Sequence, residues 1–273
     1  MAEKSGIKAS VIVVGGGIVG VCNALTLQQA GYDVTLVDRK QPGRETSYGN
    51  AGVLSESSVL VLNNPGLLRA LPRLLMGRSL ALRYSPKFIL KNLRWFLKFL
   101  SHCTPGRTRA AAFALRSLQL SSLAQHKAWI AEAGVDHLLR YAGWVKAFRS
   151  DASFAKYKRE LDLMDEAGVN YSIYDKEQIR QMEPGLKPVY AKAVFMNDTC
   201  GVSSPSALTD SYVALFEGAG GRVVKGDVRG LSKAGDIWQV DLGEATLDGE
   251  HVVIAAGPWS SEVASWLGYN IPM

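Results

Sequence analysis

A glycine-rich turn between two apolar segments constrains the fold of this chain more than any other feature. Residues 11–14 are all Val or Ile, and Gly15-x-Gly17-x-x-Gly20 follows them directly. A β-branched run of this kind is typical of a central parallel strand that is covered on both faces. A second apolar segment, residues 33–37, ends at Asp38. The pattern predicts a strand–helix–strand unit with a right-handed crossover, and hence an α/β fold.

Each glycine of this turn has a physical task at a dinucleotide. Gly15 permits the tight exit from the strand, Gly17 lets a pyrophosphate approach the backbone, and Gly20 lets the helix pack closely on the strand. The helix N-terminus presents free N–H groups and a positive partial charge to the phosphates. The residues predicted to hold the pyrophosphate are Gly15, Gly16, Gly17, Ile18, Val19 and Gly20. A glycine-rich turn without a ligand is the alternative.

The acid at the end of the second strand narrows the choice of nucleotide. A carboxylate at the position of Asp38 can accept hydrogen bonds from both ribose hydroxyls of a dinucleotide. The same charge repels a 2′-phosphate, which disfavours NADP. The turn and the acid alone leave FAD and NAD open.

The composition indicates a globular chain with an uneven charge distribution. Apolar residues make up 47% of the 273 residues, enough for a full core. No apolar run approaches the roughly 18 residues of a membrane-spanning helix, and we expect no secretory signal. Three widely spaced cysteines fit a reducing compartment and predict a cytoplasmic protein. Residues 57–131 contain twelve lysines and arginines and no acidic residue, which favours an anionic partner.

The local patterns predict further helices and strands. Helices are expected over residues 153–167 and 205–217, the second capped by Ser203 or Ser204, and a mostly helical region with breaks at Pro65, Pro72, Pro86 and Pro105. Strands are expected at residues 143–147, 191–196, 222–224 and 251–255. A meander is expected over residues 230–253, with turns at 234–236 and 248–249.

Two later motifs carry a resemblance to a known family. The run Glu45-Thr46-Ser47-Tyr48-Gly49-Asn50-Ala51-Gly52 follows the second strand, and residues 251–260 read HVVIAAGPWS. They resemble the "TSxxNAG" and "vvxAaGxWS" segments of the FAD-dependent D-amino-acid oxidase superfamily. In the order and spacing of its motifs, from about residue 10 onward, the chain is similar to the bacterial D-amino-acid dehydrogenases of that superfamily.

The resemblance implies FAD as the cofactor and assigns further contacts. It implies that Thr46 and Ser47 approach the phosphates and that Val228 contacts the adenine through its backbone. It places Asp38 at the adenosine ribose and Arg39 beside the adenine. The residues expected under the flavin ring are Asn50, Ala51 and Gly52. The residues expected to close over the nucleotide are Ala256, Gly257 and Trp259. Each assignment has an alternative. Residues 46–52 could form an ordinary loop, residues 255–259 a simple strand exit, and Val228 could be a core residue.

The resemblance also implies a domain organisation and an activity. A Rossmann-like FAD-binding parallel sheet is expected in two parts, residues 10–63 and 203–273, with an inserted α+β substrate domain at 64–202. Superfamily members are longer, so the chain is expected to match their N-terminal part, with the C-terminal part missing. The implied activity is oxidation of a D-amino acid to a 2-oxo acid and ammonia, with electrons passed to a quinone-type acceptor.

Two other functions stay open at this point. The substrate could be another amine, such as sarcosine, glycine or hydroxyproline, or the chain could be an inactive truncated fragment that binds nucleotide. No catalytic residue is assigned, because the cofactor carries the redox chemistry. No metal site is expected, because the four histidines are scattered.

Residues 86–100, which read PKFILKNLRWFLKFL, predict an amphipathic helix with one cationic stripe. Most of its other residues are Phe, Ile, Leu or Trp. Such a helix can lie in a bilayer interface with its cations at anionic headgroups, which would give peripheral contact with the inner face of the cytoplasmic membrane. Packing on its own domain is the alternative. Nucleic acid is not expected, because no recognised binding module accompanies the charge. The stripe consists of Lys87, Lys91, Arg94 and Lys98.

Overall fold

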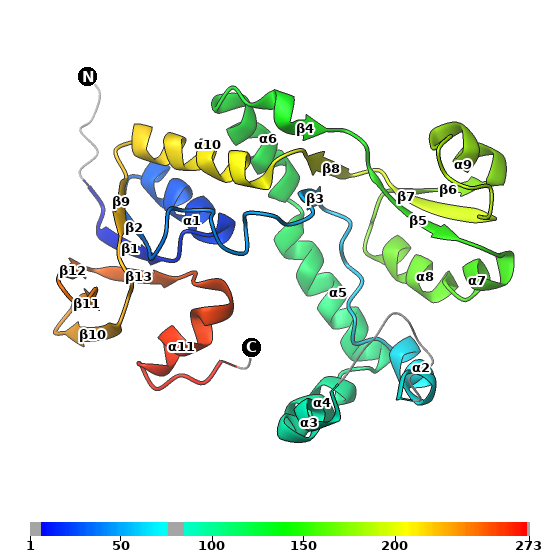
Figure 1. Ribbon diagram of the computed structural model, residues 1–273, viewed down its shortest axis with the longest axis horizontal. Helices are drawn as coiled ribbons and strands as arrows, with labels where there is room; N and C mark the ends of the chain where they lie inside the picture. Colours follow the sequence, from blue (N-terminus) through cyan, green and yellow to red (C-terminus); the bar gives the residue numbers. More distant parts are fainter. Residues whose placement is uncertain (1–6, 76–84, 272–273) are drawn as a thin grey trace. The chain divides into compact units, whose positions relative to one another are not determined.

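The computed structural model describes residues 7–75 and 85–271, and the chain divides into two compact units (Figure 1). Among the described residues, unit 1 comprises 7–53, 126–140 and 201–271, and unit 2 comprises 54–125 and 141–200. Residues 76–84, which belong to the cationic segment, lie outside the described residues.

Unit 1 is built on a four-stranded parallel sheet in the order β13-β1-β2-β9. One face of this sheet carries helices α1 and α10, and the other faces an antiparallel meander and helix α11 (Figure 1). The sheet strands are β1 (Ser10–Val14), β2 (Asp33–Asp38), β9 (Arg222–Lys225) and β13 (His251–Ile254). The other elements are α1 (Ile18–Gln29), η1 (Asp136–Leu138), β4 (Leu139–Arg140), α10 (Pro205–Gly218), β10 (Gly230–Ala234), β11 (Ile237–Asp241), β12 (Thr246–Gly249), η2 (Gly257–Trp259) and α11 (Ser260–Ser265).

The predicted strand–helix–strand unit is present, and its first strand is buried on both faces. Ile12 and Val14 pack in one cluster with Val240 of the meander and Val263 of α11. Residues alternate between the two faces of a strand, so Val13 points to the helix side, and it is fully buried there. This double coverage is the physical reason for the unbroken apolar run, and it confirms the α/β fold.

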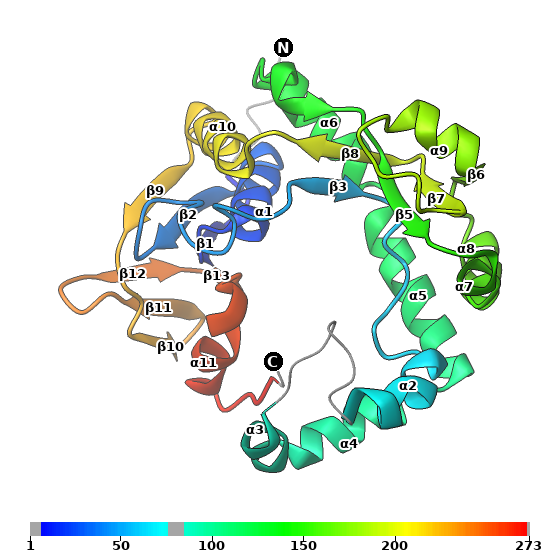
Figure 2. The same ribbon diagram turned by 45° about the vertical axis from the view of Figure 1, so that its right-hand side comes forward.

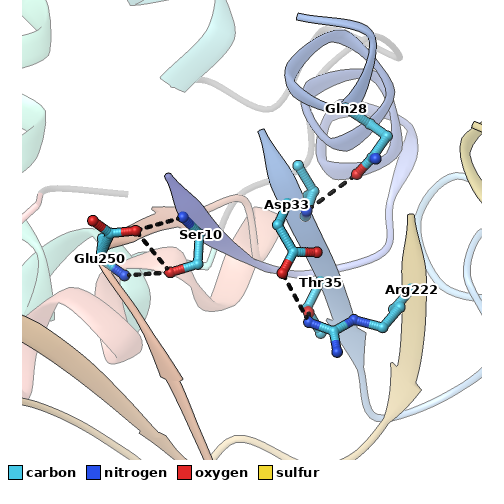
Figure 3. A network of polar contacts seen from close by, with 7 residues as sticks. Ser10, Gln28, Asp33, Thr35, Arg222 and Glu250 are labelled. Atoms are coloured by element: carbon cyan, nitrogen blue, oxygen red, sulfur yellow. Dashed lines mark hydrogen bonds and ion pairs between the residues drawn. The ribbon is translucent and has the colours of Figure 1, made fainter. Parts of the chain in front are cut away.

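A polar network joins the starts of the strands at one end of this sheet (Figure 3). The Glu250 carboxylate accepts bonds from the N–H and the hydroxyl of Ser10, at 2.8 and 3.3 Å. Arg222 donates to the hydroxyl of Thr35 at 3.2 Å and to Asp33 at 3.4 Å. These bonds tie β13 to β1 and β9 to β2 at their amino ends, and they leave the carboxyl ends of the strands for a ligand.

Unit 2 contains a three-stranded antiparallel sheet in the order β5-β7-β6, with α7 and α8 on one side and α9 on the other (Figure 2). The strands are β5 (Trp144–Phe148), β6 (Tyr171–Asp175) and β7 (Lys192–Met196). The helices are α2 (Pro65–Leu75), α3 (Pro86–Lys91), α4 (Leu93–Ser101), α5 (Pro105–Gln119), α7 (Asp151–Ala155), α8 (Lys158–Glu166) and α9 (Lys176–Met182). Three of the four divisions between the units fall within β3 (Val53–Ser55), α6 (Ser122–Glu132) and β8 (Thr199–Val202), and the fourth directly follows β4.

Several predicted helix boundaries are wrong. Pro72 does not break a helix but lies inside α2. The helix predicted over residues 153–167 is two helices, because Tyr157 turns into the core and packs on Phe148 with ring centres 5.1 Å apart. The helix predicted over residues 86–100 is also two helices. They meet at Asn92, whose side-chain amide donates to the Phe88 carbonyl at 2.9 Å.

The turn predicted at residues 248–249 is wrong, and the structure decides between the two predicted caps of α10. Gly249 belongs to β12 and pairs with Trp238, and the connection between β11 and β12 lies at residues 242–245. A Cβ on Gly249 would come within 3.0 Å of the Ile12 side chain, so glycine there serves the close approach of β12 to β1. Ser204 is the residue that caps α10, with its hydroxyl accepting from the Ala207 N–H at 3.2 Å.

Arg116 on α5 ties three backbone carbonyls of unit 2 together. It donates to the carbonyls of Glu56, Ala167 and Gly168, at 2.5, 3.2 and 3.0 Å. Hydrogen bonds to a charged donor contribute roughly 1.5–3 kcal/mol each, less where solvent reaches them. We expect Arg116→Met to lower the free energy of unfolding by about 3 kcal/mol in urea denaturation, because three carbonyls lose their donor.

Arg109 on the same helix provides the matched control. Its ion pair with Glu166 spans 2.6 Å, but the two side chains are 61% and 50% exposed. Exposed pairs contribute about 0–1 kcal/mol, so Arg109→Met should cost less than about 1 kcal/mol. Equal losses in the two variants would contradict the role of Arg116.

We expect His126 to make the stability of unit 1 depend on pH. Its Nδ1 lies 2.9 Å from the Tyr212 hydroxyl, and burial lowers the pKa of His126 below its ordinary 6.5. The unfolded chain therefore binds the proton first, and stability falls as the pH drops through 6.5. Nearby Tyr212 and Cys22 stay neutral in this range, because burial raises the pKa of each.

We expect the free energy of unfolding to fall between about pH 7 and pH 5, and His126→Gln to flatten this decline. The measurement is urea denaturation at a series of pH values. His102, which is exposed, is the control position, and His102→Gln should leave the decline in place. A decline of wild-type slope in His126→Gln would assign the effect to other groups.

Candidate cofactor site

A cleft of about 780 Å³ lies at the carboxyl ends of β1, β2 and β13 in unit 1. Ligands of open α/β sheets bind at this edge, and cofactor pockets commonly measure about 300–1,000 Å³. The predicted site residues that line the cleft are Gly15, Gly17, Ile18, Val19, Asp38, Arg39, Thr46, Ser47, Asn50, Val228, Ala256, Gly257 and Trp259. The cleft therefore brings together residues from both ends of the chain.

Gly15 and Gly17 have different surroundings in the turn. Gly15 has φ +109°, and a Cβ there would come within 2.6 Å of the carbonyl carbon of Ala255. Gly17 has an ordinary φ of −69°, and the nearest described atom to a Cβ there is the Ser47 hydroxyl oxygen at 3.3 Å. Gly15 is thus required by the chain itself, whereas Gly17 lines the cleft and has only the Ser47 hydroxyl close to the place of a Cβ.

Four predicted site residues do not line the cleft: Gly16, Gly20, Ala51 and Gly52. A Cβ on Gly20 would overlap the Gly15 carbonyl oxygen, so Gly20 sets the distance between α1 and the turn. Gly52 has φ +61° and packs against the Val202 carbonyl, and its N–H donates to Asn50 Oδ1 at 2.8 Å. Gly16, Gly20 and Gly52 thus serve close packing of the backbone and do not line the cleft.

Asp38 lies at the end of β2 with its carboxylate held by two backbone groups. Oδ2 accepts from the N–H of Gly16 at 2.7 Å, and Oδ1 accepts from the N–H of Lys40 at 2.8 Å. Each oxygen of a carboxylate has two acceptor sites, so both retain capacity for a hydroxyl donor from the cleft. The arrangement suits the recognition of a ribose.

Ser47 caps the first helix from a separate loop. Gly17 is the N-cap of α1 and has no side chain, and the Ser47 hydroxyl accepts from the Ile18 N–H at 2.8 Å in its place. Ser47 is only 8% exposed, so its position is fixed. Its own proton remains available as a donor, and the N–H of Val19 lies in the first turn of α1, where backbone N–H groups have no partner within the helix. An anion at this helix end would meet several donors.

Sequence reasoning missed several residues of the cleft. Those that line it in addition to the predicted ones include Glu45, Asp227, Arg229, Glu262 and Trp266. Glu45 stands beside the Thr46-Ser47 motif but had no assigned role. Glu262 and Trp266 lie in or next to α11 and have no local sequence signal, because their approach to the turn depends on the packing of α11.

Arg39, Glu45 and Trp259 form a contact set at one wall. The Arg39 guanidinium carbon lies 4.1 Å from the centre of the Trp259 ring. Arg39 Nε and Nη2 donate to Glu45 Oε1 at 3.3 and 3.1 Å, and Lys40 Nζ lies 2.8 Å from the same oxygen. The bond from Lys40, and next that from Arg39, lower the pKa of Glu45 against the opposing effect of burial.

Two other site features are simple. Val228 lines the cleft and also packs on the apolar cluster under the meander, so it is both a core residue and a wall residue. Cys22 lies on α1, and burial raises its pKa to about 12, which keeps it an unreactive thiol.

Within the described ranges, no group of three or more His, Cys, Asp or Glu could hold a metal ion. No described helix is both long and apolar enough to span a bilayer.

The sheet, the glycine turn and the cleft define a Rossmann-like α/β protein. The chain belongs to the DAO family, described as FAD dependent oxidoreductase, which it matches over residues 10–273. FAD is the cofactor of that family.

Curated relatives agree with this membership. The chain is 32% identical over 273 residues to a D-amino-acid oxidase of Bradyrhizobium diazoefficiens, covering 96% of this chain and 63% of that one. It is 28% identical to a D-amino acid dehydrogenase of Azorhizobium caulinodans, covering 96% of this chain and 64% of that one. The chain thus spans somewhat less than two thirds of the length of these relatives.

Solved structures share the fold at low identity. A glycine oxidase from Geobacillus kaustophilus matches with a TM-score of 0.68 at 19% identity, over 96% of this chain and 59% of that chain. An L-amino acid deaminase from Proteus myxofaciens matches with a TM-score of 0.69 at 18% identity, over 97% of this chain and 49% of that chain.

Proposed function

We propose that the cleft of unit 1 binds the adenosine diphosphate part of FAD. The observation that carries this proposal is the position of Gly17, which lines the cleft at the N-terminus of α1 and has only the Ser47 hydroxyl oxygen, at 3.3 Å, near the place of a Cβ. In this arrangement the pyrophosphate lies against Gly17, Val19 and the Ser47 hydroxyl, and Asp38 holds the ribose. Arg39 and Val228 lie at the adenine. Thr46 joins Ser47 at the phosphates, and Ala256, Gly257 and Trp259 close over the nucleotide. The flavin ring is proposed to lie over the loop of Asn50, Ala51 and Gly52, of which Asn50 lines the cleft.

The proposed activity is the oxidation of a D-amino acid. The substrate loses two electrons and two protons to become an imino acid, which water hydrolyses to a 2-oxo acid and ammonia. Bound FAD supplies the acceptor for a hydride from the substrate Cα. The described part of the chain would hold that cofactor by its adenosine diphosphate, and the acceptor proposed for the electrons is a quinone-type compound. The names of the relatives with 28–32% identity support this substrate class.

Anaerobic reduction of the bound flavin by paired substrates tests the proposed activity. The chain, loaded with FAD, is mixed with D- and L-forms of several amino acids, and with glycine, sarcosine and hydroxyproline. We expect bleaching of the flavin absorbance by at least one D-amino acid, faster than by its L-form. Reduction by an L-form or by sarcosine alone, or by none of these, would contradict the proposal.

We further propose that α3 and α4 contact an anionic membrane surface. No residue of these two wholly described helices is buried, and Phe88, Leu90 and Leu97 are 60%, 71% and 59% exposed. The exposed cations of the same helices match the charge of anionic headgroups. Such a contact would place the flavoprotein beside membrane quinones. The cations are Lys87, Lys91, Arg94 and Lys98.

Binding of the protein to lipid vesicles tests the membrane contact proposed for α3 and α4. Each cation near an anionic surface contributes about 1 kcal/mol, so replacing all four by Gln should weaken binding to phosphatidylglycerol vesicles by roughly 100-fold or more. Co-sedimentation at low and high salt measures the effect. Replacing four exposed cations elsewhere in unit 2 is the control and should change binding far less. An equal loss would mean that net charge alone directs the contact. The control positions are Lys156, Lys176, Arg180 and Lys187.

A further inference from the structure

Three segments of unit 1 meet at one wall of the cleft through single side chains. Arg39 follows β2, Glu45 lies in the loop after it, and Trp259 ends η2, more than two hundred residues later. All three line the cleft. The wall therefore depends on a contact between the two ends of the chain rather than on one element.

Glu45 accepts two hydrogen bonds from the Arg39 guanidinium. An arginine side chain has many rotamers, and contact with an exposed aromatic ring contributes only about 0.5–1 kcal/mol toward holding one of them. Here Nε and Nη2 both donate to Glu45 Oε1, which holds the guanidinium over the Trp259 ring. Trp259 remains 37% exposed, so the contact with Arg39 leaves part of the ring open.

Lys40 also contacts Glu45, but it does not belong to the wall of the cleft. Its Nζ lies 2.8 Å from the same Glu45 oxygen, but its side chain is 56% exposed and it does not line the cleft. Lys40 helps to keep the Glu45 carboxylate charged, as the lowered pKa of Glu45 indicates. The bonds from Arg39, in contrast, connect Glu45 to a side chain that itself lines the cleft.

We propose that Glu45 is a positioning residue that holds Arg39 against Trp259 and so forms the adenine side of the cleft before the nucleotide binds. A guanidinium and an indole held together present a flat, cationic surface on which a purine can stack. Forming that surface in advance removes its ordering cost from the binding step. This inference rests on the proposed FAD site.

The test is an equilibrium titration of the 273-residue chain with FAD, followed by flavin fluorescence. We expect Glu45→Ala to weaken FAD binding about tenfold. Glu45→Gln should stay within about threefold of wild type, because its amide oxygen can still accept both bonds from Arg39. Lys40→Met should also bind like wild type. Thermal melts of the apo forms identify any variant whose fold is altered.

A double-mutant cycle separates positioning from a general structural effect. If Glu45 acts through Arg39, Glu45→Ala should change nothing further in an Arg39→Met background. An equal loss in both backgrounds would overturn the inference, as would unchanged or tighter binding by Glu45→Ala alone. Absence of FAD binding by the wild type would overturn the proposed site itself, and this inference with it.

Discussion

Gly17→Ala should weaken FAD binding by about 2 kcal/mol, roughly 30-fold, while leaving the fold intact. The added methyl group would meet only the Ser47 hydroxyl, at 3.3 Å, and the backbone at Gly17 has an ordinary φ. The same methyl group projects into the space where a pyrophosphate would approach the main chain, and it would displace the charge-assisted bonds to the helix end. Isothermal titration with FAD measures the loss.

Gly49→Ala is the matched control for this variant. Gly49 lies in the loop that carries Ser47, does not line the cleft, and has no described atom within 4 Å of a Cβ built on it. Its affinity for FAD should equal that of the wild type. The cost of Gly17→Ala in stability should stay below about 1 kcal/mol, the size of an N-cap effect. A Gly17→Ala protein that binds FAD as tightly as wild type would place the pyrophosphate elsewhere.

Gly20→Ala should have the opposite profile and destabilise unit 1 by about 3 kcal/mol. Its Cβ would overlap the Gly15 carbonyl oxygen and come within 2.9 Å of the carbonyl carbon. Both are backbone atoms of the turn, so relief requires α1 to move away from β1 and open the core around fully buried Val21. Urea denaturation of the apo chain measures the loss.

The two glycines thus separate binding from folding within one turn. If Gly20→Ala were as stable as wild type, the close helix–strand contact would not be a constraint, and the reason for glycine at that position would be wrong. FAD should partly restore the stability of Gly20→Ala, because a ligand that binds only the folded state stabilises it by mass action. FAD at the same concentration should raise the stability of Gly17→Ala much less, because that variant binds FAD more weakly.

The first part of the fold was predictable because its signals are local. The apolar run of β1, the spacing of Gly15, Gly17 and Gly20, and the acid Asp38 lie within one strand–helix–strand unit. Each follows from a constraint between close neighbours in sequence, so the pattern predicts both the fold and the position of the cleft. The resemblance to a flavoprotein family added the residues around Ser47 and Trp259, which no periodicity indicates.

The remaining site could not be predicted because it depends on contacts across the chain. Glu45 acquires a role only when Arg39 and Trp259 meet, which requires β2 and β13 to flank β1. The sequence suggested a turn at Gly249. Glycine is needed there because the Ile12 side chain of a distant strand leaves no room for a Cβ. Asn92 divides the cationic helix through a side-chain bond that helical spacing does not reveal.

A competition experiment tests the central claim most directly, namely that the cleft at the carboxyl ends of β1, β2 and β13 holds the adenosine diphosphate part of FAD. FAD bound to the chain is titrated with ADP and, separately, with FMN, which lacks the adenosine part. The account predicts that ADP displaces FAD, that FMN does not, and that Gly17→Ala weakens FAD and ADP by the same factor. Displacement by FMN but not by ADP would contradict it.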